Sequence, residues 1–125
     1  MHENDLSYLI RGISFSIHSE LGPGLLESVY ESALAYELRN SGCDVKTQLG
    51  IPVRYKEIKI DQGFRADILV NDKVVIEVKS VESLSEVHYK QLLTYLKLSN
   101  KKLGLLINFN ATSLRGQIKR IVNGL

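Results

Sequence analysis

The sequence predicts a single α/β domain, spanning residues 1–125, in which a mixed sheet carries helices on its faces. Three observations predict this class. Apolar residues recur at helical spacing through the first 40 residues, and the middle third is rich in β-branched residues at strand spacing. A nearly all-apolar run then follows a further helical segment. The expected order of elements is α-α-β-β-β-β-α-β-α, and the chain length suits one domain.

The first two elements are helices separated by a glycine-rich break. The first runs from about Leu6 to Glu20, and Gly22-Pro23-Gly24 then interrupts the periodicity. The second extends from about Leu25 to Asn40. If Gly24 is its N-cap, Glu27 occupies the third helical position, where a glutamate favours the helix dipole.

The middle third predicts an antiparallel meander of short strands. Two turn signals, Asp61-Gln62-Gly63 and Asn71-Asp72, divide it. The expected strands are Val45–Leu49, Val53–Ile60, Phe64–Val70 and Val74–Val81.

The last third predicts a crossover helix, a buried strand and a terminal helix. Ser83-Leu84-Ser85-Glu86 fits a capping box that opens a helix to about Leu98. This helix can link two parallel strands, and the run from Leu103 to Phe109 suits a strand buried on both faces. The tail from Ser113 to Val122 alternates apolar and basic residues in a way that predicts a short, basic C-terminal helix.

The composition of the chain excludes some classes of protein but does not identify the function. The formal net charge is +2, which neither demands nor excludes a nucleic-acid partner. Cys43 is the only cysteine, so the chain has no intramolecular disulfide and no multi-cysteine zinc site. No apolar run approaches the roughly 20 residues of a membrane span. We therefore expect a cytoplasmic setting and no membrane partner.

Three charged residues in strand-like runs are the main candidates for chemistry. Asp67 lies in the run before the Asn71-Asp72 turn, and Glu77 and Lys79 lie on one face of the run after it. Two carboxylates close together repel each other, and a divalent cation such as Mg²⁺ relieves that repulsion. Lys79 could then hold a water molecule or a phosphate. A solvated strand face is the alternative explanation.

Two helical segments could add to such a site. Gln91 and Tyr95 lie on a polar stripe of the helix that follows Lys79, where its first turns could overhang the charges. Glu27 and Tyr30 are one turn apart on the second helix. Their alternative roles are a first-turn glutamate that stabilises the helix and a packing tyrosine.

Together these residues resemble the PD-(D/E)XK nuclease superfamily. The resemblance rests on Asp67, then Glu77-Val78-Lys79, then Gln91-x-x-x-Tyr95. It is closer still to a small bacterial and archaeal branch named for a Gly-x-x-Glu-x-x-Tyr motif, which Gly24, Glu27 and Tyr30 match. The superfamily name implies a proline before the first acid, whereas this chain has Ala66.

The resemblance implies a restriction-endonuclease-like α-β-β-β-α-β core, here with an extra N-terminal helix. It implies that Asp67 and Glu77 bind the metal, that Glu27 lies near it, and that the carbonyl of Val78 completes the metal shell. It also implies that Lys79 is the catalytic lysine and that Gln91 and Tyr95 support the site or the substrate.

The expected function is therefore a Mg²⁺-dependent nuclease acting on DNA, with Mn²⁺ able to substitute. Phosphate contacts would come from basic residues and would make binding salt-dependent; the candidates are Lys90, Arg115, Lys119 and Arg120. The alternatives are a nucleic-acid-binding module without useful catalysis and an interaction subunit of a repair or defence system, with the N-terminal apolar stripe as a homodimer interface. No base-reading motif selects among junction, flap, single-stranded, duplex and RNA substrates.

Overall fold

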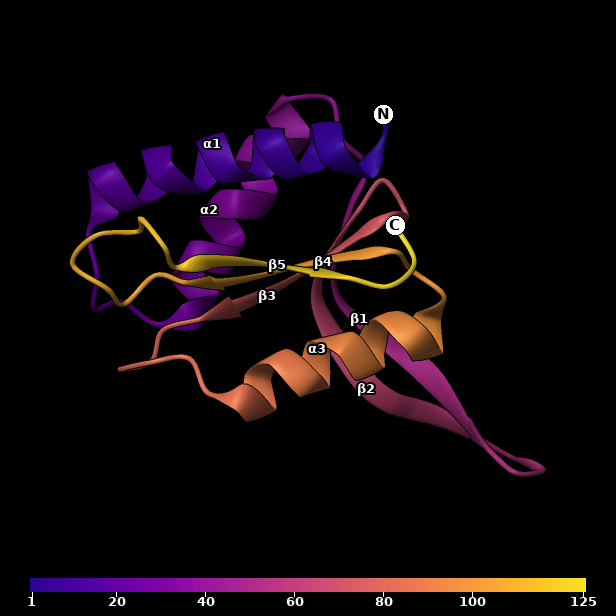
Figure 1. Ribbon diagram of the computed structural model, residues 1–125. Helices are drawn as coiled ribbons and strands as arrows, with labels where there is room; N and C mark the ends of the chain where they lie inside the picture. The colour runs from indigo at the N-terminus through magenta and orange to yellow at the C-terminus, as the bar shows by residue number, and fades with distance from the viewer.

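One five-stranded mixed sheet forms the centre of the molecule, with helices on both of its faces (Figure 1). The computed structural model describes residues 1–125. The elements in chain order are α1 (Glu3–Leu21), α2 (Glu27–Asn40), β1 (Val45–Tyr55), β2 (Ile58–Val70), β3 (Val74–Lys79), α3 (Glu86–Ser99), β4 (Leu103–Asn108) and β5 (Ile118–Val122). The predicted mixed α/β class is confirmed. None of the three helices combines the length and apolar character that a membrane crossing requires.

The strands follow the order β1-β2-β3-β4-β5, and only the β3–β4 pair is parallel. The helix α3 connects these two strands, so the predicted crossover is confirmed. All six residues of β4 are buried, as expected for a strand covered on both faces.

The sheet separates two apolar clusters. The larger one joins α1 and α2 to one face, and its helical members include Leu6, Ile10 and Leu34. The smaller one joins α3 to the opposite face through Leu92 and Leu96. Leu6, Ile10 and Ile17 of the N-terminal stripe therefore serve core packing. A homodimer interface on this stripe stays a prediction, which sedimentation would test.

The predicted C-terminal helix is wrong, because residues 118–122 form the edge strand β5 against β4. Ile118 packs on the α1–α2 side and Ile121 on the α3 side, as strand alternation requires. Gly116, at φ 76°, interrupts the tail just before this strand. The open edge of β4 and the β-branched residues of the tail favour strand pairing over a helix.

The predicted turn at Asp61-Gln62-Gly63 is also wrong. The strand β2 runs through these residues, and the hairpin turns instead at Lys56 and Glu57. The β1–β2 register shifts between Ile51 and Val53, so residues 61–63 lie opposite Pro52. Since proline has no N–H to donate to the ladder, the glycine-containing segment forms a bulge there rather than a turn.

Three boundary predictions need smaller corrections. The helix α1 begins at Glu3, with His2 as its N-cap, rather than at about Leu6. The helix α2 begins at Glu27 with Leu26 as its N-cap, so Glu27 holds the first helical position rather than the third. The N-cap of α3 is Ser85 rather than Ser83, because the side chain of His88 accepts the Ser85 N–H at 3.1 Å. The predicted Asn71-Asp72 turn is confirmed, and both residues take positive φ.

Candidate functional site

Asp67 and Glu77 meet where β2 and β3 separate. The backbone pairing of these strands extends from Val70↔Val74 to Ile68↔Ile76. It does not include Asp67, the neighbour of Ile68 in β2. Beyond that point, side chains replace the ladder. The N–H of Val78 donates to Oδ2 of Asp67 at 2.9 Å, and the N–H of Asp67 donates to Oε1 of Glu77 at 3.4 Å.

The alternation of β2 side chains between the two faces of the sheet is interrupted at the same place. Both Ala66 and Leu69 contribute to the α3-side cluster, although residues three apart on a regular strand face opposite sides. This local irregularity accompanies the separation of the two strands. It lets the Asp67 carboxylate reach the backbone of β3, which a fully paired strand would occupy with its own N–H and C=O groups.

Glu77 is a buried carboxylate, with only 7% of its surface exposed. Burial raises the pKa of Glu77 to about 8, and the neighbouring Asp67 charge adds to this effect. Lys79 acts in the opposite direction and lowers the Glu77 pKa. Two carboxylates so placed are unfavourable without a cation nearby.

These donors fit a hard divalent cation. Carboxylate and carbonyl oxygens are the ligands that Mg²⁺ prefers, and Mg²⁺ usually keeps several waters, so two carboxylates suffice. The chain has no group of three or more His, Cys, Asp or Glu side chains placed to hold an ion. The structure therefore brings Asp67 and Glu77 together but does not bring Glu27 into the same group.

Lys79 lies at the end of β3, two residues after Glu77 and on the same face of the sheet. Its side chain is half-buried and forms no ion pair. The neighbouring strand fixes the backbone here, because the Phe109 N–H donates to the Lys79 carbonyl at 2.9 Å. The Lys79 charge lies close enough to Glu77 to lower the pKa of that carboxyl group.

Glu27 holds the chain just after Lys79. Its Oε2 accepts the N–H of Ser80 at 3.0 Å, and the Ser80 hydroxyl donates to the Leu25 carbonyl at 2.8 Å. The first turn of α2 is thereby attached to the end of β3. Glu27 itself is exposed.

Tyr30 is fully buried, which makes it a supporting residue that cannot contact a substrate. Its hydroxyl donates to the Gly22 carbonyl at 2.6 Å and accepts the Leu25 N–H at 3.1 Å. Its ring stacks on Phe109 with centroids 4.5 Å apart. Tyr30 thus holds the glycine-rich loop that leads into Glu27.

The helix α3 brings Tyr95 towards the acidic pair. Burial raises the pKa of the Tyr95 hydroxyl, and the charges of Glu77 and Asp67 add to the effect, whereas a hydrogen bond from Gln91 lowers it. Phe64 of β2 stacks on Tyr95 with centroids 3.9 Å apart. Gln91 is exposed and lies one turn before Tyr95 on α3.

Two residues near the site were missed by sequence reasoning, namely Glu31 and Gln48. The Gln48 side-chain nitrogen donates to Glu31 Oε1 at 2.6 Å and to Asp67 Oδ1 at 3.3 Å. Burial raises the pKa of Glu31, and the charges of Asp67 and Glu27 add to it. The four-residue spacing of Glu27 and Glu31, which places them on one helix face, was the available signal.

The predicted basic residues lie in different places. Lys119 is opposite Leu106, which is itself opposite Glu77, so Lys119 lies on the Glu77 face two strands away. Arg120 lies on the other face, where it donates to the Asn4 side chain of α1. Lys90 forms an exposed ion pair with Glu86 within α3. Arg115 is exposed on the loop between β4 and β5.

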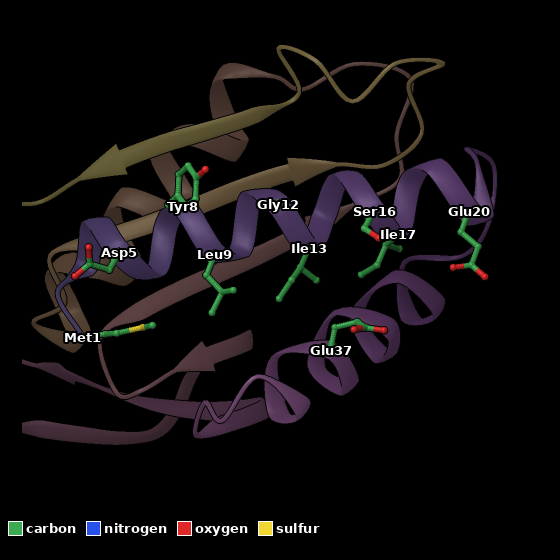
Figure 2. A pocket seen from close by; sticks show the side chains of 10 residues that line it. All are labelled: Met1, Asp5, Tyr8, Leu9, Gly12, Ile13, Ser16, Ile17, Glu20 and Glu37. Atoms are coloured by element: carbon green, nitrogen blue, oxygen red, sulfur yellow. The ribbon is translucent and has the colours of Figure 1, made fainter.

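The largest cavity is not at this site. A groove of about 700 Å³ runs along α1, where Leu9, Ile13 and Ile17 point towards α2 and Glu37 faces them (Figure 2). The residues that line the groove do not include Asp67, Glu77 or Lys79. The groove lies on the α1–α2 side of the sheet, whereas Glu77 and Lys79 face the α3 side.

Comparison with known proteins gives one match. The family model described as the PD-(D/E)XK nuclease superfamily matches residues 4–121, which reach from α1 into β5. No curated protein and no solved structure matched the chain. The matched range contains every acidic, basic and aromatic residue of the site described above.

Proposed function

Because the chain belongs to the PD-(D/E)XK nuclease superfamily, we propose that it is a Mg²⁺-dependent phosphodiester hydrolase that acts on DNA. The observation that carries this proposal is the meeting of Asp67 and Glu77 where β2 and β3 separate, with Lys79 two residues further along β3 on the Glu77 face. The crowded, partly desolvated carboxylates favour a cation, and the adjacent ammonium favours an anionic substrate.

In this proposal, Asp67 and Glu77 bind the cation together with the carbonyl oxygen of Val78. A divalent cation would make a bound water easier to deprotonate and would offset charge on the attacked phosphate. Lys79 orients the attacking water and stabilises the charge that develops on the phosphate oxygens. Glu27 holds the end of β3 and thereby the position of Lys79.

The substrate would lie across the open side of the site, between α3 and the end of the sheet. Lys119 supports this path because it shares the Glu77 face, at about 10 Å across two strand spacings. Lys90 and Arg115 would add phosphate contacts at the periphery. Such contacts carry no base information, and they predict binding that weakens steeply with salt.

We also assign the chain to the branch named for the Gly-x-x-Glu-x-x-Tyr motif. Each motif position has a distinct local role. Gly24 takes φ 94°, Glu27 accepts the Ser80 N–H, and Tyr30 bonds both ends of the Gly22–Leu25 loop. The motif would therefore be a device that fixes α2 against the end of β3.

Cleavage assays test the proposal. Labelled duplex, single-stranded, flap and junction DNA, with matched RNA, are incubated with Mg²⁺, Mn²⁺ or EDTA. The wild type is compared with Asp67→Asn and Lys79→Met. Asp61→Asn and Lys97→Met serve as matched controls, because both residues are exposed and lie outside the site.

The expected result is cation-dependent cleavage of at least one DNA form, lost in both site variants and kept in both controls. Cleavage of RNA alone would replace the DNA assignment. DNA binding without cleavage under any cation, by a folded protein, would contradict the enzyme and favour a binding module.

A further inference from the structure

Gln48 has an unusual backbone conformation at the position facing Asp67. Its neighbours in β1 pair as Thr47↔Ile68 and Leu49↔Ala66, so Gln48 stands opposite Asp67 in the register. Gln48 nevertheless takes φ 49°, in the left-handed region that non-glycine residues rarely adopt, least of all within a strand. Such a conformation persists only where the surroundings hold it, and it is enriched at functional sites.

The conformation allows the Gln48 side chain to bridge two acids from different elements. Its amide nitrogen has two hydrogens, and it donates to Glu31 Oε1 on α2 and to Asp67 Oδ1 on β2. The distances are 2.6 Å and 3.3 Å respectively. The donor capacity of this nitrogen is therefore fully used between two carboxylates.

Asp67 is thereby held at both of its oxygens. Gln48 donates to Oδ1, and the Val78 N–H donates to Oδ2 at 2.9 Å. Rotation of the carboxylate about its terminal bond would break at least one of these hydrogen bonds. Each oxygen keeps a further lone pair, so the carboxylate is fixed without being saturated.

We propose that Gln48 is a positioning residue that fixes the Asp67 carboxylate for cation binding, and that Glu31 acts through Gln48 by holding its amide. This inference rests on the proposed function. Groups that orient metal ligands from the second layer typically change metal affinity by roughly 10- to 100-fold when removed. Gln48 is exposed, so this hydrogen-bonded chain lies on the solvent side of the site.

Gln48→Gly separates this role from a purely structural one. Glycine adopts positive φ at little cost, so the metal-free variant should melt within about 5 °C of the wild type. The Mn²⁺ dissociation constant from calorimetry should nevertheless rise about tenfold. Gln48→Met, which keeps the side-chain length, should give the same loss of affinity. Gln62→Ala should change nothing, because Gln62 is an exposed glutamine of β2 whose side chain accepts a hydrogen bond from Arg65, away from Asp67.

A second readout needs no metal. If Gln48 orients Asp67, its removal weakens the Val78 N–H hydrogen bond, so the Val78 amide should exchange with solvent faster in metal-free Gln48→Gly. The Ile76 and Ile107 amides, in the buried sheet, should keep their wild-type rates. Unchanged Val78 exchange would overturn the inference, even for a protein that proved to cleave nothing.

A double-mutant cycle tests the order of action. If Glu31 works only through Gln48, then Glu31→Met, Gln48→Met and the double variant should all raise the Mn²⁺ dissociation constant by about the same tenfold factor. Independent, multiplying effects would show that Glu31 reaches the cation by another route and would overturn the proposal. A wild type that binds no Mn²⁺, with Val78 exchange responding as expected, would instead remove the proposed function and leave Gln48 as a residue that orients Asp67.

Discussion

Asp67 forms two hydrogen bonds with β3 at the end of the β2–β3 ladder, one with the Glu77 side chain and one with the backbone of Val78. The Asp67 N–H donates to Glu77 at 3.4 Å, and Asp67 itself accepts the N–H of Val78, the next residue, at 2.9 Å. Side-chain oxygens thus replace backbone partners where the strands separate. The same contacts bring two carboxylates together in a place where one of them is buried.

The metal-free protein should lose stability as pH rises. The Glu77 pKa is about 8 in the folded chain, against 4.5 for an unperturbed glutamate. Below about pH 4.5 both states hold the proton. Between about pH 4.5 and 8 only the folded state does, so the free energy of unfolding should fall by a few kcal/mol and then level off.

Urea titrations in EDTA across this pH range measure the free energy of unfolding. In the Glu77→Gln variant, the dependence of this free energy on pH should be nearly flat between pH 5 and 8. Glu57→Gln, in the exposed hairpin turn, should leave the slope as it is. A wild type whose stability is constant across the range would contradict the crowding of Asp67 and Glu77.

Divalent cations should stabilise the fold through the same two carboxylates. Mn²⁺ at about 100 times its dissociation constant should raise the free energy of unfolding by about 2.7 kcal/mol, because only the folded state binds it. Thermal melts at pH 8 with increasing Mn²⁺ check this. Asp67→Asn should abolish the shift; an equal shift in that variant would place the cation elsewhere.

Lys79→Met should separate catalysis from metal binding. The variant loses the charge that stabilises the transition state, so cleavage should slow by about 100-fold or more. Its Mn²⁺ affinity should not fall, since the lost group is a cation rather than a ligand. Single-turnover cleavage and calorimetry on the same sample give both quantities, and equal losses in the two would refute this division of roles.

Tyr30→Phe should weaken folding. The change leaves the Gly22 carbonyl and the Leu25 N–H without their shared partner, at a cost of about 1–3 kcal/mol. Tyr36→Phe, on an exposed side of the same helix, should cost almost nothing. Denaturant unfolding compares the two variants. Equal stabilities would argue against Tyr30 as the support of the loop before Glu27.

The acidic pair and its lysine could be predicted because charged side chains in apolar, β-branched strands are conspicuous. Strand alternation placed Glu77 and Lys79 on one face, and the Asn71-Asp72 turn placed Asp67 on the neighbouring strand. The structure agrees on both points. The crossover helix and the buried strand β4 were predictable for a similar reason, since local patterns define them.

Gln48 and Glu31 could not be predicted in this way. An exposed glutamine and a helical glutamate are ordinary in any sequence, and their meeting depends on how α2 docks against β1. The strand β5 was missed for a related reason. The five residues of β5 are too few to distinguish helical from strand spacing. They form a strand because they pair with the edge of β4, a contact that the sequence pattern does not reveal.

The position of Mn²⁺ in a crystal grown or soaked with that ion tests directly whether Asp67 and Glu77 together bind a cation. We expect an anomalous difference peak between the carboxylates of Asp67 and Glu77, about 2.0–2.3 Å from an oxygen of each, and near the Val78 carbonyl. No peak between these two carboxylates, or ordered Mn²⁺ only at another place in the molecule, would contradict it.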